Sequence, residues 1–271
     1  MNAYIVSHNG MGDNLYMIGA INYIKQFYEN VFFICKNKYY ENVKLFNASM
    51  ICIPFDEKNE FEEIYKLLID KYQNKLNDIF ICGCHTQYLN SKVTNPKFLN
   101  HRMIMTVRNE YNIDYDTLTS NNYAFIENFY KDIGLNLTHF YDYYDLPSTD
   151  ESKELLNAVS NYYIVFIQYK SSDGKTLNIS NLLKKYLNDK NVILLCNDMN
   201  LYQPHDDKYK LAQLFVFNKI ANYVDIIKNS NEIYIIDSCF VGIVLPLLKK
   251  NQLKSTHTRI ILRDHAHEYI L

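Results

Sequence analysis

Residues 3–25 read AYIVSHNGMGDNLYMIGAINYIK, and this stretch decides the fold. The short apolar run Ala3–Val6 is typical of a buried strand. Apolar residues then recur at helical spacing, at Met17, Ala20, Ile21, Ile24 and Phe27. Gly10, Gly12 and Asp13 lie between the two patterns. A strand, a glycine-containing turn and a helix in this order predict the start of an α/β fold.

The same alternation continues along the chain. Strands are predicted at Ala3–Ser7, Val31–Lys36, Met50–Pro54, Asp78–Gly83, Tyr162–Tyr169, Asn191–Cys196, Leu211–Phe217, Glu232–Asp237 and Thr258–Leu262. Helices are predicted at 14–28, 59–72, 118–132, 179–188, 218–229 and 239–250. Gly134 is expected to form the C-cap of the helix that precedes it. Strands that alternate with helices indicate parallel sheets with helices on both faces.

A polar segment that contains a proline, residues 141–150, is the best candidate linker. It divides the 271 residues into an N-terminal Rossmann-like domain, 1–147, and a C-terminal one, 148–271. We therefore predict an α/β protein of two Rossmann-like domains, with mostly parallel sheets that face each other across a cleft. Open α/β sheets bind their ligands in such a place.

Composition excludes several classes of protein. The formal charge of -2 and the pI of about 6.4 provide no basic field to bind nucleic acid. No apolar run approaches the roughly 20 residues of a transmembrane helix, and the N-terminus does not resemble a signal peptide. The six cysteines lie mostly in apolar, strand-like runs, which favours reduced buried thiols. A cytoplasmic location is the expectation.

The glycine loop that follows the first strand is not a dinucleotide fingerprint. Leu15 occupies the position of the required third glycine, and no acidic residue stands at Cys35–Asn37, near the end of the second strand. Asp13 suits the N-cap of the following helix. Two glycines just before it indicate close approach of a ligand or of a neighbouring segment. An aspartate at the carboxyl end of a first strand is also well placed to act as a base, and both interpretations stay open.

Two further loops follow apolar strands. Gly174-Lys175-Thr176 resembles the end of a Walker A loop, but Tyr169 stands where that motif requires its first glycine. A lysine among hydroxyl groups beyond a strand suits a diphosphate, and it also suits a solvated loop. Asp237 precedes a serine at a predicted helix start, where backbone N–H groups favour an anion or sugar hydroxyls, and where a simple helix cap is equally expected.

Two weaker patterns concern metals. Cys82-Gly83-Cys84-His85 has the spacing of metal ligands, but no fourth partner is obvious nearby. Asp114-Tyr115-Asp116 is an Asp-x-Asp string of the kind that some metal-dependent sugar transferases use. No clear buried strand leads into it.

Three segments in order resemble a known family. GMGDNLYMIGAINYIK (10–25), YKSSDGKTLNI (169–179) and YIIDSCFVGIVLPLL (234–248) are similar to the motifs of the ADP-heptose:lipopolysaccharide heptosyltransferases, glycosyltransferase family 9. The resemblance implies a GT-B fold. It also implies metal-independent transfer of a sugar from a nucleotide-sugar donor, with inversion at the anomeric carbon. Cys239 and Gly242 depart from the pattern, which has glycine and histidine at those positions.

The resemblance also assigns roles to residues. Asp13 matches the aspartate proposed as the general base on the acceptor hydroxyl, and Lys175 matches the lysine that contacts the donor phosphates. The acceptor-side loop would consist of Asn9, Gly10, Gly12 and Asn14. The donor would be bound by Lys175, Ser172, Thr176, Asp237, Ser238 and Cys239. No metal and no cofactor are expected, because the nucleotide sugar is a substrate.

The function that we predict is therefore an inverting, metal-independent glycosyltransferase acting on a glycan or glycoconjugate acceptor. Its partners would be the nucleotide-sugar donor and that acceptor, without nucleic acid, without a transmembrane segment and with room for peripheral membrane contact. One alternative is a metal-dependent sugar transferase that uses Asp114 and Asp116. The other is a protein that binds sugars or nucleotides without catalysis.

Overall fold

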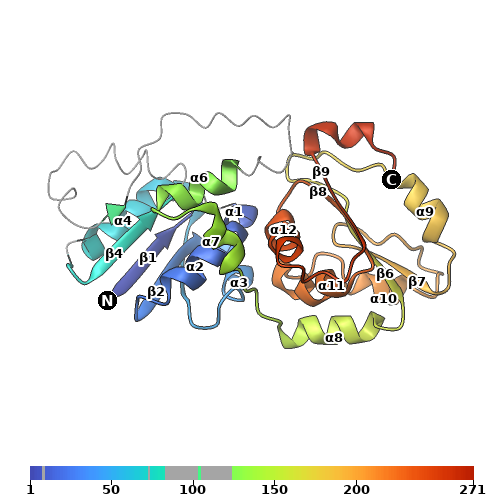
Figure 1. Cartoon of the computed structure of the whole chain (residues 1–271), viewed down its shortest axis with the longest axis horizontal. Helices are drawn as coiled ribbons and strands as arrows, with labels where there is room; N and C mark the ends of the chain where they lie inside the picture. The colour runs from blue at the N-terminus through green and yellow to red at the C-terminus, as the bar shows by residue number, and fades with distance from the viewer. Residues whose placement is uncertain (8–9, 73, 83–102, 105–123) are drawn as a thin grey trace. The chain divides into compact units, whose positions relative to one another are not determined.

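The computed structural model (Figure 1) describes residues 1–7, 10–72, 74–82, 103–104 and 124–271. Within these ranges the chain forms two compact units, Met1–Leu146 (unit 1) and Pro147–Leu271 (unit 2). Each unit contains one sheet, and every strand pair of the described residues is parallel. The α/β architecture with parallel sheets that the strand–helix alternation predicts is confirmed.

Unit 1 has the strand order β3-β2-β1-β4-β5, with β1 in the middle. Its strands are β1 (Asn2–Val6), β2 (Asn30–Lys36), β3 (Ile51–Phe55), β4 (Asn77–Ile81) and β5 (Met103–Ile104). Its helices are α1 (Met11–Tyr16), α2 (Ile18–Ile24), α3 (Tyr40–Val43), α4 (Glu60–Tyr72), α6 (Ala124–Asp132) and α7 (Leu137–Asp142), with the 3-10 turns η1 (Asn37–Tyr39) and η2 (Glu57–Asn59).

Unit 2 has the strand order β7-β6-β8-β9. Its strands are β6 (Tyr163–Gln168), β7 (Val192–Cys196), β8 (Glu232–Ile236) and β9 (His257–Ile261). Its helices are α8 (Asp150–Val159), α9 (Ser180–Tyr186), α10 (Tyr209–Gln213), α11 (Val224–Asn229) and α12 (Val241–Lys249), with the 3-10 turns η3 (Ile220–Tyr223) and η4 (Arg263–Glu268).

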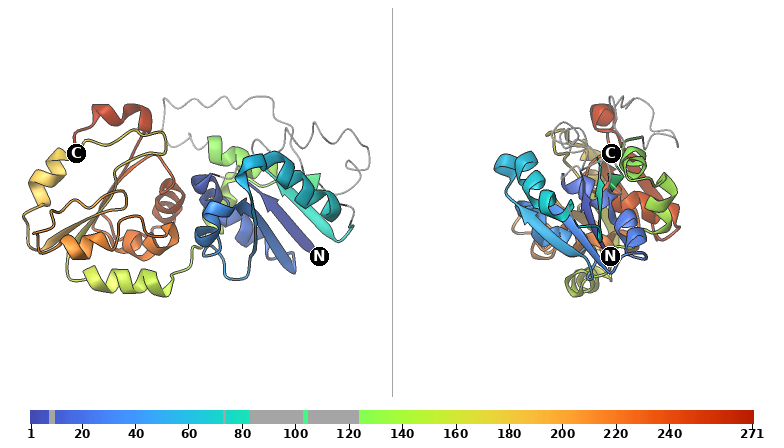
Figure 2. Two further views of the ribbon diagram at one scale, coloured as in Figure 1. Left: turned by 180° about the vertical axis from the view of Figure 1, so that it is seen from behind. Right: turned by 90° about the vertical axis from the view of Figure 1, so that its left-hand side faces the viewer.

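The residues that end at Leu271 lie against the start of α9, as the left view in Figure 2 shows. The N–H of Leu271 donates to the carbonyl of Asn178 at 2.7 Å, and the N–H of Leu182 donates to the carbonyl of Leu271 at 2.9 Å. These two bonds join the segment after β9 to the start of α9.

Most predicted strands agree with the structure to within one residue, but the strand predicted at Leu211–Phe217 is wrong. This segment contains the end of α10 and a turn. Ala212 and Phe215 are buried, whereas Leu214 and Phe217 are exposed. Burial three residues apart is the spacing of a helical turn, so a run of apolar residues alone misled the prediction. Of the predicted helix 118–132, residues 118–123 lie outside the described ranges.

Gly134 ends α6 as the sequence predicts. It has a φ of 76°, in the region that favours glycine, and its N–H donates to the carbonyl of Lys131 at 3.1 Å. The N–H of Leu135 reaches back to the carbonyl of Tyr130 at 2.8 Å. These two bonds form a Schellman motif, so the predicted C-cap is confirmed.

The predicted helix 14–28 is divided into α1 and α2, and Tyr130 accounts for the break. The buried Tyr130 hydroxyl donates to the carbonyl of Tyr16 at 2.8 Å and accepts from the N–H of Ala20 at 3.1 Å. In a continuous helix Ala20 would donate to Tyr16 directly. A side chain inserted into this ladder separates the two helices, and the short α1 follows directly on the glycine loop.

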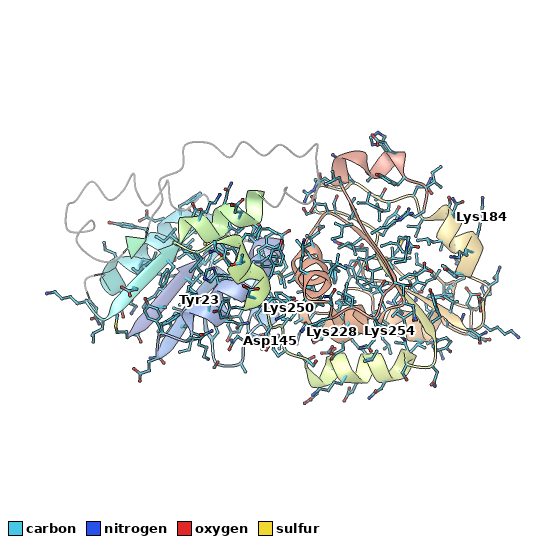
Figure 3. The ribbon with its side chains drawn as sticks, viewed as in Figure 1. Tyr23, Asp145, Lys184, Lys228, Lys250 and Lys254 are labelled. Atoms are coloured by element: carbon cyan, nitrogen blue, oxygen red, sulfur yellow. The ribbon has the colours of Figure 1, made fainter. Side chains whose placement is uncertain are left out.

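Helix α2 lies unusually close to α7. A Cβ at Gly19 would be 2.5 Å from the carbonyl oxygen of His139 and 2.8 Å from the Cα of Phe140, so only glycine fits. One turn further along, the ring of Tyr23 (Figure 3) packs edge-on against His139 and against Tyr143, with centroid distances of 4.5 and 4.8 Å. This close contact between the two backbones holds α2 in place against α7.

Strand β1 is covered on both of its faces. Tyr4 and Val6 belong to a buried cluster that includes Ile64 of α4, and the alternate residues Ala3 and Ile5 are buried as well. A strand that is apolar on both faces is typical of the middle of a parallel sheet. It holds the loop after β1 in place.

A cluster of polar side chains occupies the amino ends of β6 and β8. The buried carboxylate of Glu232 accepts hydrogen bonds from the hydroxyls of Tyr163 (3.0 Å), Tyr186 (2.5 Å) and Tyr234 (2.7 Å). Lys185 lies 3.8 Å from the same carboxylate. Burial opposes ionisation of Glu232, but these hydrogen bonds outweigh it and lower its pKa. The cluster is well satisfied, which indicates a structural role.

We expect Gly19→Ala to lower the free energy of unfolding by about 1–3 kcal/mol, because the added methyl group overpacks the contact with α7. Alanine is the better helix former by about 1 kcal/mol, so a loss of stability cannot come from helix propensity. Urea unfolding followed by circular dichroism measures the difference. Unchanged or increased stability would show that α2 and α7 can separate at no cost.

The Glu232 cluster predicts a specific pH dependence. The lowered pKa means that its stabilising effect is complete above about pH 4.5, the ordinary pKa of glutamic acid, and is lost as the pH falls through the lowered value. Glu232→Gln should therefore be less stable than the parent chain at pH 7, and the gap should narrow below about pH 4.5. Urea unfolding of both proteins between pH 7 and pH 3 tests this. A gap that stays constant over this range would contradict it.

Candidate functional site

Polar side chains gather where the parallel strands of each unit end. In unit 1 Ser7 follows β1 directly. In unit 2 polar residues end β6 or follow β7, β8 and β9 at the same edge, and the set comprises Gln168, Asn197, Asp198, Asp237, Ser238, Cys239 and Arg263. Parallel strands bring their carboxyl ends to one edge, and ligands of open α/β sheets bind there. Each unit therefore has a candidate site at this edge.

In unit 1 the N-cap of α1 is Gly10, so the prediction that Asp13 is the N-cap residue is wrong. Asp13 is the third residue of the helix, and its Oδ2 accepts the N–H of Gly10 at 2.9 Å. A Cβ at Gly10 would lie 2.5 Å from that oxygen. The first glycine is thus explained by the approach of the Asp13 carboxylate, which is half-buried. This carboxylate is held by the backbone at the carboxyl end of β1.

Asn14 ties the same helix to the strand. Its Oδ1 accepts a hydrogen bond from the hydroxyl of Ser7 at 2.6 Å, and both side chains are fully buried. Its Nδ2 is buried without a partner among the described residues. Gly12 lies in the first turn of α1, half-buried, and Asn9 falls outside the described ranges. Gly10, Gly12, Asp13 and Asn14 therefore all lie at the start of α1, at the carboxyl end of β1.

In unit 2 the segment after β6 folds back as a tight turn. The N–H of Ser171 donates to the carbonyl of Lys175 at 2.9 Å, and the N–H of Gly174 donates to the carbonyl of Ser171 at 3.0 Å. Gly174 has a φ of 89°, which explains the glycine. The turn does not lead directly into a helix and so differs from a Walker A loop. The predicted donor-binding residues of this turn are all exposed: Ser172, Lys175 and Thr176.

Asp198, which the sequence analysis missed, holds this turn in place. Its Oδ2 accepts the backbone N–H groups of Tyr169 and Lys170, both at 2.9 Å. Its Oδ1 accepts the side-chain amide of Asn197 at 3.2 Å. Burial raises the pKa of Asp198, and the backbone hydrogen bonds oppose that shift. The available signal was a polar pair, Asn197-Asp198, directly after an apolar strand.

The loop after β8 meets the end of β6. Gln168 is only 2% exposed, its Nε2 lies 3.8 Å from the Sγ of Cys239, and its Oε1 is buried with no partner in the described structure. Burial raises the pKa of the Cys239 thiol to about 11, so it is neutral at pH 7. Ser238 is buried and Asp237 half-buried, and the N–H of Asp237 donates to the carbonyl of Ile261 at 2.7 Å. The edge therefore offers polar atoms to a ligand.

An aromatic ring stands at the same edge. The N–H of Phe217 donates to the carbonyl of Asn197 at 2.8 Å, and the residue has a φ of 53°, which is rare for a residue other than glycine. Its side chain is 79% exposed. The Oδ1 of Asn197 is buried and lacks a hydrogen-bond partner in the parts of the chain described. A flat apolar face and an acceptor atom thus lie together beyond β7.

The metal patterns of the sequence cannot be placed. Cys84, His85, Asp114 and Asp116 all lie outside the described ranges. Among the residues that the structure does describe, no group of three or more His, Cys, Asp or Glu side chains could hold a metal ion. No helix in that same part of the chain combines the length and apolarity needed to cross a membrane.

Two solved structures share the fold of this chain. ADP-heptose lipopolysaccharide heptosyltransferase II from E. coli matches with a TM-score of 0.57 and 10% identity, over 96% of this chain and 90% of that one. A glycosyl transferase of family 9 from Veillonella parvula matches with a TM-score of 0.58 and 10% identity, over 96% and 86%. No family model and no curated protein matches the sequence. The resemblance inferred from three short motifs is therefore confirmed as a shared fold.

Asp198→Ala should release the turn after β6, because the N–H groups of Tyr169 and Lys170 lose their shared acceptor. We expect a loss of about 1–3 kcal/mol in unfolding free energy and faster hydrogen exchange at these two amides. Asp189→Ala is the matched control, since Asp189 accepts one exposed backbone N–H, that of Asn191 at 2.9 Å. Exchange rates that are the same in both variants would contradict the role given to Asp198.

Proposed function

We propose that the chain is an inverting, metal-independent glycosyltransferase that moves a sugar from a nucleotide-sugar donor to a glycan or glycoconjugate acceptor. One observation carries the proposal: among the described residues, Gln168 Oε1 and Asn197 Oδ1 are buried without partners at the edge that also bears Lys175. Acceptor atoms of this kind fit the hydroxyls of a sugar or ribose, and a lysine fits phosphate. The fold shared with two glycosyltransferases supports the same class.

The donor would bind to unit 2. Lys175, with Ser172 and Thr176 on the same turn, would stabilise the negative charge of the leaving nucleoside diphosphate. Asp237 and Ser238 would face the hydroxyls of the sugar. The neutral thiol of Cys239 would limit the space beside them. The exposed ring of Phe217 offers a stacking face for the base.

The acceptor would bind to unit 1, at the loop of Asn9, Gly10, Gly12 and Asn14. Asp13 would take the proton of the acceptor hydroxyl while the oxygen attacks the anomeric carbon. The bond from that carbon to the diphosphate breaks on the opposite side, which inverts the configuration. The hydrogen bond from the N–H of Gly10 keeps the carboxylate oriented for this role.

The chemical class of the substrates follows from the neighbours only in part. The E. coli protein is named for ADP-heptose and lipopolysaccharide. We propose the broader class for this chain, a sugar bound to a nucleoside diphosphate and a glycoconjugate acceptor. Cys239 and Gly242 differ from the family's motif at the donor sugar, so the proposal does not name ADP-heptose as the donor. A panel of nucleotide sugars, screened by thermal shift and then for transfer or hydrolysis, would identify it.

Asp13→Asn should reduce transfer by on the order of 100- to 10,000-fold, the usual effect of removing a general base. The amide oxygen can still accept the N–H of Gly10, so fold and donor affinity should be nearly unchanged. Initial rates with the donor found in the panel, together with donor Kd from calorimetry, measure both effects. Asp145→Asn is the control, since this exposed aspartate of the same unit should leave the rate unchanged.

Three outcomes would contradict this proposal. Full activity of Asp13→Asn would exclude Asp13 as the base. Activity that is lost on complete chelation of divalent metals would favour the metal-dependent mechanism with Asp114 and Asp116. Donor binding without turnover, whatever the acceptor, would favour a protein that binds nucleotide sugars without catalysis.

A further inference from the structure

We propose that Arg263 binds the phosphate groups of the donor together with Lys175, as a second cation at the edge of unit 2. This inference rests on the proposed function and adds a residue that none of the three sequence motifs contains. Arg263 comes two residues after the end of β9, whose last carbonyl, that of Ile261, accepts the N–H of Asp237. The backbone at Arg263 therefore lies close to the loop that follows β8.

The hydrogen-bond donors of the Arg263 guanidinium are only partly satisfied by the described residues. Its Nη1 lies 4.0 Å from Oδ2 of Asp173, which is the limit of an ion pair and leaves no bidentate contact. Its Nε is buried and has no hydrogen-bond partner among the described residues. The side chain as a whole is 31% exposed. A guanidinium has five N–H donors, so this one retains capacity for an anion that reaches it from solvent.

Asp173 positions the arginine beside the turn that carries Lys175. Its Oδ1 accepts the hydroxyl of Ser171, whose backbone is in turn bonded to Lys175. The hydrogen bond from Ser171, and then the charge of Arg263, lower the pKa of Asp173, so its carboxylate is ionised at neutral pH. The ion pair thus draws the guanidinium towards a turn whose lysine, two residues further on, is exposed.

Two cations from separate elements suit a diphosphate better than a monoanion. Arginine presents a planar fork that matches two oxygens of a phosphate, while lysine acts as a point charge. An alternative role for Arg263 is purely structural, with the ion pair merely holding the turn after β6. The two roles differ in one measurable respect, because only the first makes the affinity for a diphosphate depend on Arg263.

Inorganic pyrophosphate is the probe, since it contains the two phosphates without base or sugar. We expect the parent protein to bind it, and Arg263→Gln to weaken its Kd by on the order of 10- to 100-fold in calorimetry at low ionic strength. Arg259→Gln is the matched control. Arg259 is an exposed arginine in the middle of the same strand, β9, level with Tyr234 of β8, and its loss should leave the Kd unchanged.

A second variant covers the case in which Arg263→Gln fails to fold. Arg263→Lys keeps the charge and the contact with Asp173 but loses the fork, and a Kd weakened at least about threefold supports the proposal. An unchanged Kd in the folded Arg263 variant, an equal loss in Arg259→Gln, or no binding of pyrophosphate by the parent protein would overturn it. Transfer of a sugar by a protein that fails this test would leave the proposed function intact. Arginine-dependent pyrophosphate binding without transfer would leave only this inference standing.

Discussion

Parallel pairing of the strands in unit 2 is the constraint on which the candidate site depends. Its register sets Ile167 of β6 level with Cys196 of β7, and Ile236 of β8 level with Ile261 of β9. The strands therefore end almost together, and whatever follows each of them lies along one edge. Gln168, Asp198 and Asp237 become neighbours although about 70 residues of chain separate the first from the last. No local signal in the sequence could place them together without that pairing.

Carboxylates hold the turns at these strand ends. Asp13 accepts the N–H of Gly10 in unit 1, and Asp198 accepts those of Tyr169 and Lys170 in unit 2. In both places side-chain carboxyl oxygens satisfy backbone donors that a loop would otherwise leave to water. The loops are consequently shaped before any ligand arrives, which lowers the conformational entropy that binding must overcome. An oriented carboxylate at Asp13 is also what the proposed proton transfer would require.

The sequence predicts the elements well where one physical signal decides them. Apolar runs that end in polar residues locate the ends of most strands within one residue, and a glycine two positions past a helix locates a Schellman motif. The prediction fails where a residue far away in the sequence determines the local structure. Tyr130 breaks the predicted helix 14–28 from more than 100 positions away, and nothing in 14–28 marks the break. Aspartate favours the N-cap position, so the sequence alone predicts Asp13 there, but in the structure Gly10 is the N-cap and Asp13 Oδ2 accepts its N–H from three residues further on.

The same limit applies to the candidate site. Asp13, Lys175 and Asp237 belong to patterns of adjacent residues and can be found by inspection. Asp198 and Arg263 make contacts with turns that lie elsewhere in the chain, and a polar residue after an apolar strand does not by itself indicate such a contact. Only the fold gives them a role.

The two edges of the sheet in unit 2 differ in how fully their buried polar groups are hydrogen-bonded. At the amino edge both carboxylate oxygens of Glu232 are hydrogen-bonded by tyrosine hydroxyls. At the carboxyl edge Gln168 Oε1 and Arg263 Nε are buried without partners in the described structure. Each such atom costs about 1–3 kcal/mol of folding free energy unless something pairs with it. The fold satisfies its polar groups at one edge and leaves a hydrogen-bond acceptor and a cation at the other, which is the complement that sugar hydroxyls and phosphates require.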